Sequence, residues 1–226
     1  MAKLKDQRAR RITADWAALF PEFSVWRPLR LLRRIGPVLQ GISLERTVSA
    51  ERYSPTAHVH SLAREFPVIS LSLAHHLHPT VQGRDEIDVD RHELEFRAAA
   101  VRLEERSTLP LRRWPDLAEI VHAYRAAAVG ARQGRLPAGV VELEDCVLVP
   151  AAAGERALAG ESLRFVVETA RRWSKYEAPT GWSDTREWLD WLEARVDDPT
   201  DLMAVVDEQV TGHGLSGVGT TGLRRA

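Results

Sequence analysis

The feature that most constrains this chain is a change in hydrophobic period from 3.6 to two residues at Pro37. Apolar and polar residues alternate in four successive runs, which cover residues 38–46, 53–62, 67–76 and 85–91. A period of two is typical of strands that bury one face. We therefore expect an antiparallel β-meander over about 38–91. Its buried face should carry Ile42, Leu44, Val59, Ile69, Leu71, Leu73, Ile87 and Val89.

Helical periods flank this segment on both sides. Ile12, Trp16 and Phe20 recur at helical spacing before it, and a short second helix is expected over 28–36. Further helices are expected at about 92–106, from 115, and over 155–175, 184–196 and 200–210. Residues 140–150 (VVELEDCVLVP) predict one more strand. The chain is thus expected to be α+β, a meander flanked by helices and followed by a helical C-terminal region.

The expected organisation has three parts. Residues 1–150 form the α+β domain, and residues 151–210 form a helical region that packs on it or stands as a small subdomain. Residues 211–226 are expected to be disordered, because five glycines fall between positions 212 and 222 and raise the entropic cost of ordering.

Composition favours a globular protein of a reducing compartment. The 226 residues carry a formal charge of -1 and a single cysteine, Cys146, which cannot form an intramolecular disulfide. No apolar run approaches the roughly 18 residues that a membrane span needs, and the N-terminal residues lack the apolar core of a secretory signal. We therefore expect a cytoplasmic location and no membrane span.

The balance of basic residues points to a high-GC bacterial genome. Only Lys3, Lys5 and Lys175 are lysines among the 31 basic residues, and the chain has no asparagine. The arginine surplus therefore reflects codon usage rather than phosphate recognition.

The two ends of the chain differ in charge. Residues 1–34 carry nine basic and three acidic residues, a net of +6, and residues 184–208 carry nine acidic and two basic residues, a net of -7. Such ends can attract one another within the fold or between subunits, or can be solvated helix faces. No nucleic-acid-binding motif accompanies the basic segment, so a nucleic-acid partner is not expected.

Histidines are the most unusual chemical feature. If the strands have the expected phase, six potential metal ligands lie on or beside the polar face of the meander: His58, His60, His76, Asp88, Asp90 and His92. Imidazole nitrogens and carboxylate oxygens are the ligands of Zn or another divalent transition metal. The alternative is that these residues are ordinary polar groups on a half-exposed sheet.

A second candidate site is a tryptophan cluster near the C-terminus. Trp182, Trp188 and Trp191 lie close together, and the last two share a helical face. They can anchor a protein partner, or they can form the seam between small helices.

No standard catalytic motif in the sequence points to an enzymatic activity. The glycines at 212, 214 and 217 match a dinucleotide fingerprint literally, but they lack the strand before and the helix after that the fingerprint requires. We therefore expect a non-enzymatic binding or regulatory protein with no cofactor, acting through a protein partner or self-association. The alternative is a metal-dependent hydrolase that uses the histidine and aspartate cluster.

Overall fold

The structure is a computed structural model that describes residues 2–46, 51–76, 86–133, 139–173 and 179–222. It confirms the α+β class, with an antiparallel meander and a helical C-terminal region. The N-terminal half runs α1 (Ala2–Leu19), β1 (Ser24–Arg27), β2 (Arg30–Ile35), β3 (Val38–Arg46), β4 (Arg52–Ser61), β5 (Ser72–His76), β6 (Ile87–Asp88), a 3-10 turn (Val89–Arg91) and α2 (His92–Arg106). The rest runs α3 (Leu117–Gln133), α4 (Val140–Ala152), α5 (Arg156–Ala170), α6 (Thr185–Asp197), α7 (Pro199–Gly212) and β7 (Thr220–Thr221).

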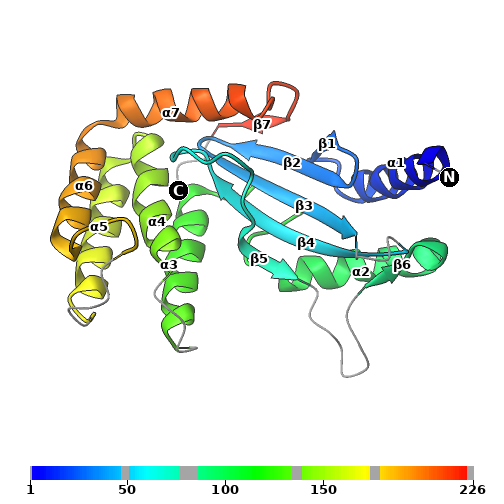
Figure 1. Cartoon of the computed structure of the whole chain (residues 1–226), viewed down its shortest axis with the longest axis horizontal. Helices are drawn as coiled ribbons and strands as arrows, with labels where there is room; N and C mark the ends of the chain where they lie inside the picture. Colours follow the sequence, from blue (N-terminus) through cyan, green and yellow to red (C-terminus); the bar gives the residue numbers. More distant parts are fainter. Residues whose placement is uncertain (1, 47–50, 77–85, 134–138, 174–178, 223–226) are drawn as a thin grey trace.

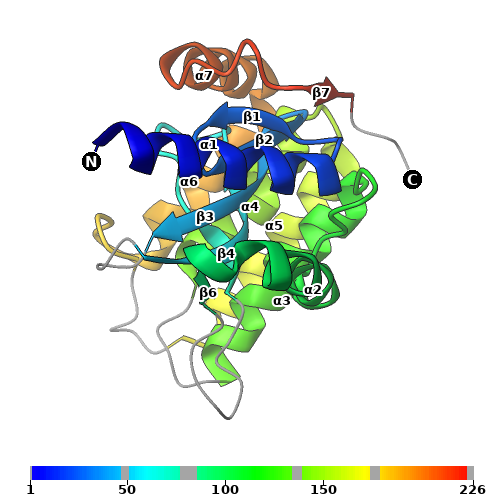
Figure 2. The same ribbon diagram turned by 90° about the vertical axis from the view of Figure 1, so that its right-hand side faces the viewer.

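The sheet has the order β1-β2-β3-β4-β5, with β6 beside β4 and β7 beside β2. All pairs are antiparallel except the short β2–β7 pair. Figure 1 shows the sheet at the centre, with α3 to α6 gathered at one end and α1 at the other. Figure 2 shows α1 and α2 lying across the same face of the sheet.

One face of the sheet packs on α1 and α2. Leu31, Ile42 and Ala57 are register partners on β2, β3 and β4, and all three are buried in one cluster with Trp16 of α1 and Phe96 of α2. This is the apolar face that the alternation predicts. Of the eight residues expected to be buried there, Ile42, Leu44 and Ile87 belong to this cluster, and Val59 and Leu73 are buried in a second cluster. Ile69, Leu71 and Val89 are only half-buried.

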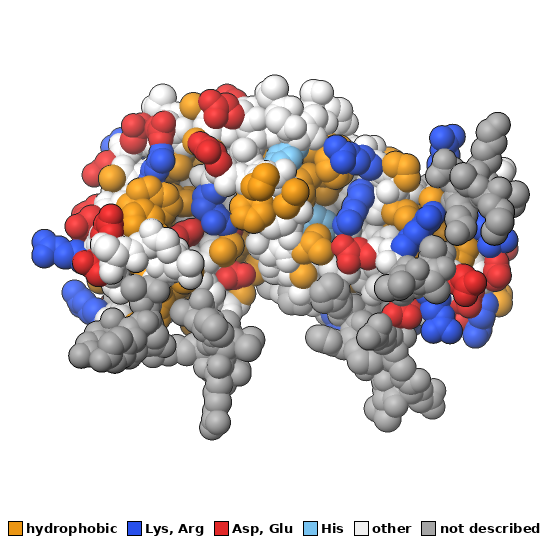
Figure 3. Space-filling view, viewed as in Figure 1, with side chains coloured by type: hydrophobic (Ala, Val, Ile, Leu, Met, Phe, Trp, Pro, Cys, Tyr) orange, Lys and Arg blue, Asp and Glu red, His pale blue; other side chains and the backbone are white. Residues whose placement is uncertain are grey.

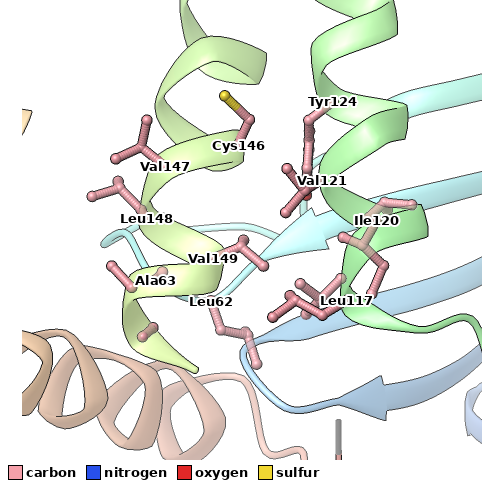
Figure 4. Packing of buried hydrophobic residues seen from close by; sticks show 14 of the residues in the cluster. Leu62, Ala63, Leu117, Ile120, Val121, Tyr124, Cys146, Val147, Leu148 and Val149 are labelled. Carbon is pink, nitrogen blue, oxygen red and sulfur yellow. The ribbon is translucent and has the colours of Figure 1, made fainter. Parts of the chain in front are cut away.

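A second core joins the end of the sheet to the helical region. Leu62, just after β4, lies between α3 and α4 near Leu117 and Val149, and Ala63 lies beside α4 (Figure 4). The same cluster continues into α5, α6 and α7. The helical region therefore begins at α3, well before residue 151, and it shares its core with the sheet.

Two predicted elements are wrong in type. Within the predicted helix 28–36, residues 30–35 form strand β2. Leu31 and Leu32 are buried on opposite faces, so the strand lacks the alternation by which it could be recognised. Residues 140–150 belong to helix α4 rather than to a strand. Every residue of this helix from Leu143 to Ala152 is buried, Glu144 and Asp145 included, so its apolar and acidic residues do not follow a helical period.

The expectation of disorder at the C-terminus is also wrong for residues 211–222. Leu215 and Val218 are buried, and the backbone N–H of Arg34 donates to the carbonyl of Gly219 at 2.9 Å. Strand β7 then pairs with Arg34 and Ile35 of β2. The glycines permit the turns of this segment, and burial of Leu215 and Val218 offsets the entropic cost of ordering it.

Replacing Leu215 with Ala should therefore destabilise the protein by about 2–4 kcal/mol, since a buried leucine is lost. The free energy of unfolding in urea measures this. Met203 on α7 is exposed, and Met203→Ala should change it by less than about 0.5 kcal/mol. Equal effects of the two substitutions would show that the tail does not contribute to the core.

Candidate functional site

The sheet face opposite α1 and α2 carries a histidine whose ring rests on a glycine. His58 of β4 is the register partner of Gly41 of β3, which is paired in turn with Leu32 of β2. A Cβ atom at position 41 would lie 2.3 Å from the Nε2 atom of His58 and 2.8 Å from a Leu32 methyl. Glycine is therefore required at this position, because any side chain would occupy the space of the imidazole.

His58 is buried without a hydrogen-bond partner. The residue is 3% exposed, and within the described ranges neither ring nitrogen is paired. Burial, with smaller contributions from the charges of Arg30 and His60, lowers the pKa of His58 to about 3, so the ring is neutral near pH 7. An unpaired buried polar group costs about 1–3 kcal/mol. Such a group calls for an explanation, and a bound molecule that supplies the missing partner is one.

His58 lines a cavity of about 420 Å³ on this face. The rest of the lining combines apolar residues with three charged ones: Trp26, Arg27, Pro28, Arg30, Leu32, Glu45, Ile69 and Leu71. Strands β1, β2, β3 and β4 supply most of it, and the connection between β4 and β5 supplies Ile69 and Leu71. Figure 3 shows histidine surface on this side of the molecule, among hydrophobic, arginine and acidic side chains.

Two guanidinium groups and one carboxylate belong to this lining. Arg30 lies 3.3 Å from Glu45, and both side chains are partly exposed. The Arg27 guanidinium stacks on the ring of Trp26, 4.0 Å from its centroid. No carboxylate within the described ranges pairs with Arg27. The cavity therefore carries a net positive charge when His58 is neutral.

The second histidine of β4 fixes the segment that covers this sheet face. The Nδ1 atom of His60 lies 2.8 Å from the Ser70 hydroxyl and accepts from the Ser70 backbone N–H at 3.1 Å. Its ring also meets Phe66 and His213 edge to face. Burial, with the nearby His213, lowers the pKa of His60 to about 4. His60 thus holds residues 66–70 over the sheet, next to the cavity.

His92 lies on the opposite face of the sheet. Its Nδ1 atom is 2.6 Å from the Tyr53 hydroxyl, its Nε2 atom is 3.1 Å from Asp15, and its ring stacks on Phe96. Tyr53 in turn accepts from the indole of Trp16 at 3.1 Å. This buried chain of hydrogen bonds ties α1 and α2 to β4, and both ring nitrogens of His92 are used in it.

The remaining predicted metal ligands are dispersed. Asp88 caps the 3-10 turn by accepting from the Asp90 backbone N–H, and Asp90 pairs with Arg8 at 3.0 Å. The backbone of His76 pairs with Thr56, but its side chain lies outside the described residues. In the described part of the chain, no three His, Cys, Asp or Glu residues are grouped to hold a metal ion. His58, His60 and His92 do not converge, and a metal site that includes His76 stays a prediction.

The tryptophans of the second predicted site belong to the helical core. Trp188 is fully buried, stacks on Trp173 with ring centroids 5.4 Å apart, and donates to Glu144 at 2.9 Å. Trp182 and Trp191 contact each other and are half-buried. Trp188 therefore acts within the fold. A protein-binding role for Trp182 and Trp191 stays a prediction.

Sequence reasoning missed a buried ionic group beside Trp188. Arg64, just after β4, donates to Asp145 of α4 at 2.9 Å and to Glu144 at 3.2 Å. Asp145 is fully buried, and this burial raises its pKa to about 6 although Arg64 acts in the opposite direction. The wrong assignment of residues 140–150 as a strand concealed this contact.

The cavity was missed as well, although one signal for it was present. An isolated glycine inside a strand often marks a close approach by another group, and Gly41 does so here. Glu45 gave no comparable signal, and the segment around Arg27 and Arg30 was assigned to a helix, so neither arginine was placed beside His58.

Comparison with protein-family models, with curated proteins and with solved structures finds no match to this chain. None of the helices within the described ranges carries an apolar stretch long enough to cross a lipid bilayer. The function is therefore argued from the site alone.

The contact between Gly41 and His58 can be tested by a double-mutant cycle. Gly41→Ala should cost about 1–3 kcal/mol, because the new methyl group displaces the imidazole. In the His58→Ala background the same substitution should cost clearly less, because the ring is gone. Urea unfolding of the four proteins measures both effects. Equal costs in the two backgrounds would contradict this packing.

Stability should depend on pH through His58. The unfolded histidine takes up a proton near pH 6.5, and the folded one only near pH 3, so protonation favours the unfolded state as pH falls below 6.5. Near pH 5 the free energy of unfolding should fall by about 1.4 kcal/mol for each unit by which the pH is lowered. His58→Phe should remove this part of the pH dependence of stability. His60 and Asp145 are present in both proteins, so their contributions cancel in the comparison. Identical pH profiles between pH 7 and 4.5 would contradict the buried neutral state.

Proposed function

We propose that this protein is a non-enzymatic binding protein of a bacterial cytoplasm whose binding element is the cavity over His58. The observation that supports it is the buried, unpaired imidazole lining a cavity of about 420 Å³. This volume lies within the usual range of small-molecule sites, which combine apolar walls with a few polar groups. The site thus differs from the tryptophan surface that the sequence predicts.

Binding suits this site better than acid–base catalysis. A general acid or base works best when its pKa lies near the operating pH. The pKa of His58 is about 3, and Glu45 is paired with Arg30. His58 is therefore not prepared to exchange a proton near pH 7, and the Glu45 carboxylate is engaged by Arg30.

A regulatory role requires that a molecule bound in the cavity changes a surface that a partner contacts. The wall of the cavity connects it to such a surface. Residues 66–71 line or adjoin the cavity, and the Phe66 backbone N–H donates to Gln209 of α7 at 3.1 Å. We propose that the partner is another protein or a second copy of this chain. Nucleic acid fits less well, because Arg8 and Arg11 of the basic α1 helix are already paired with Asp90 and Glu93.

The proposal is tested by thermal unfolding with a panel of small organic acids, amines and alcohols. At least one compound should raise Tm by several degrees, since a ligand at 100 times its Kd adds about 2.7 kcal/mol. Ile69→Trp, which fills the cavity, should abolish the shift. The matched control is Val68→Trp, which places the same side chain at the neighbouring exposed position and should retain it. No shift for any compound, or equal shifts in the three proteins, would overturn the proposal.

A further inference from the structure

The distribution of charge in the cavity indicates which molecules it accepts, if the proposed binding function holds. The charged residues of its lining are Arg27, Arg30 and Glu45, so the lining has one more positive than negative charge. Glu45 is matched by Arg30. The Arg27 guanidinium, held on the Trp26 ring, is left to meet a negative charge from outside the protein.

The lining is polarised from its mouth to its floor. Arg27 is exposed, and Arg30 and Glu45 are partly exposed, so the charged groups lie toward solvent. Leu32 is buried, and Ile69 and Leu71 are half-buried. A molecule with a charged head and an apolar body therefore matches the cavity better than one that is polar throughout.

His58 adds a specific polar contact beside Arg30. On β2, Arg30 pairs with Ser43, which pairs with Thr56, two residues before His58 on the same face of β4. A neutral imidazole offers one N–H donor, and neither ring nitrogen of His58 is paired within the described chain. A carboxylate or phosphate oxygen accepts hydrogen bonds from both guanidinium and imidazole groups.

We propose that the cavity binds a small amphipathic organic anion, with its carboxylate or phosphate held by Arg27, Arg30 and His58 and its apolar body against Trp26, Leu32, Ile69 and Leu71. The apolar surfaces supply affinity, and the charged mouth selects for a negative head. A cation of the same size would face unmatched positive charge at the mouth.

The test uses four probes that share one tail: octanoate, octyl phosphate, octylammonium and octanol. Calorimetry on the whole protein should show at least one of the two anions binding about tenfold or more tightly than the amine and the alcohol, as expected for charge-assisted hydrogen bonds. The ratio of the dissociation constants of octanoate and octyl phosphate identifies the preferred head group. Raising the salt concentration should weaken the binding of the anions and leave the affinity for octanol unchanged.

Charge variants make the assignment specific. Arg27→Gln and Arg30→Gln should each weaken the preferred anion by about tenfold, while octanol binding stays the same. The double variant leaves Glu45 as the remaining charge in the lining and should reverse the preference toward octylammonium. The matched control is Arg34→Gln, which removes an arginine of the same strand and face that does not line the cavity, and it should change nothing.

The outcomes separate this inference from the binding function. If all four probes bind equally to the native protein and Ile69→Trp blocks them, the cavity binds ligands but the anion preference is wrong. If Arg34→Gln weakens the anions as much as Arg27→Gln does, the head group is held elsewhere and the assignment is wrong. If no probe binds, and no compound of the wider panel shifts Tm, both the inference and the proposed function fail.

Discussion

The pairing of β3 with β4 is the constraint on which the rest of this structure depends. These strands form a ladder of nine consecutive residue pairs, from Val38 and Ser61 to Arg46 and Tyr53. The ladder is covered on both faces, by α1 and α2 on one side and by the connection to β5 on the other. Consecutive residues of both strands are therefore buried whatever their polarity, and this places Gln40, His58 and His60 in the interior.

The buried polar groups are satisfied by contacts between distant segments. Gln40 accepts from Arg33, which also donates to the carbonyls of Pro110 and Arg113. Arg64 joins the end of β4 to the two acidic residues of α4. Such buried ion pairs add little net stability, because desolvation offsets attraction, but removing one partner leaves an unpaired charge. They fix how the helical region sits against the sheet.

The cavity follows from the unequal cover of the two sheet faces. Regular helices pack continuously on the side of Ile42, whereas an irregular segment held by His60 and Ser70 covers the side of His58. This segment leaves space between Ile69, Leu71 and the hairpin of β1 and β2. His58 is thus buried beside this space without a hydrogen-bond partner. The charged residues at the mouth of the cavity determine which molecules it favours.

The sequence by itself determined the class of the fold, the position of the meander and helix 92–106, because periods of two and 3.6 residues are local properties of the chain. It also brought out His58 and His60, which do share one sheet face. Tertiary structure alone decided that this face is covered, that residues 140–150 are helical and that Leu215 docks. An element that is buried on all sides has no exposed face, so the order of its polar and apolar residues does not reveal its helical or strand period. The separation of His92 from His58 depends on which face each strand presents, and only the packing of α2 against Tyr53 fixes it.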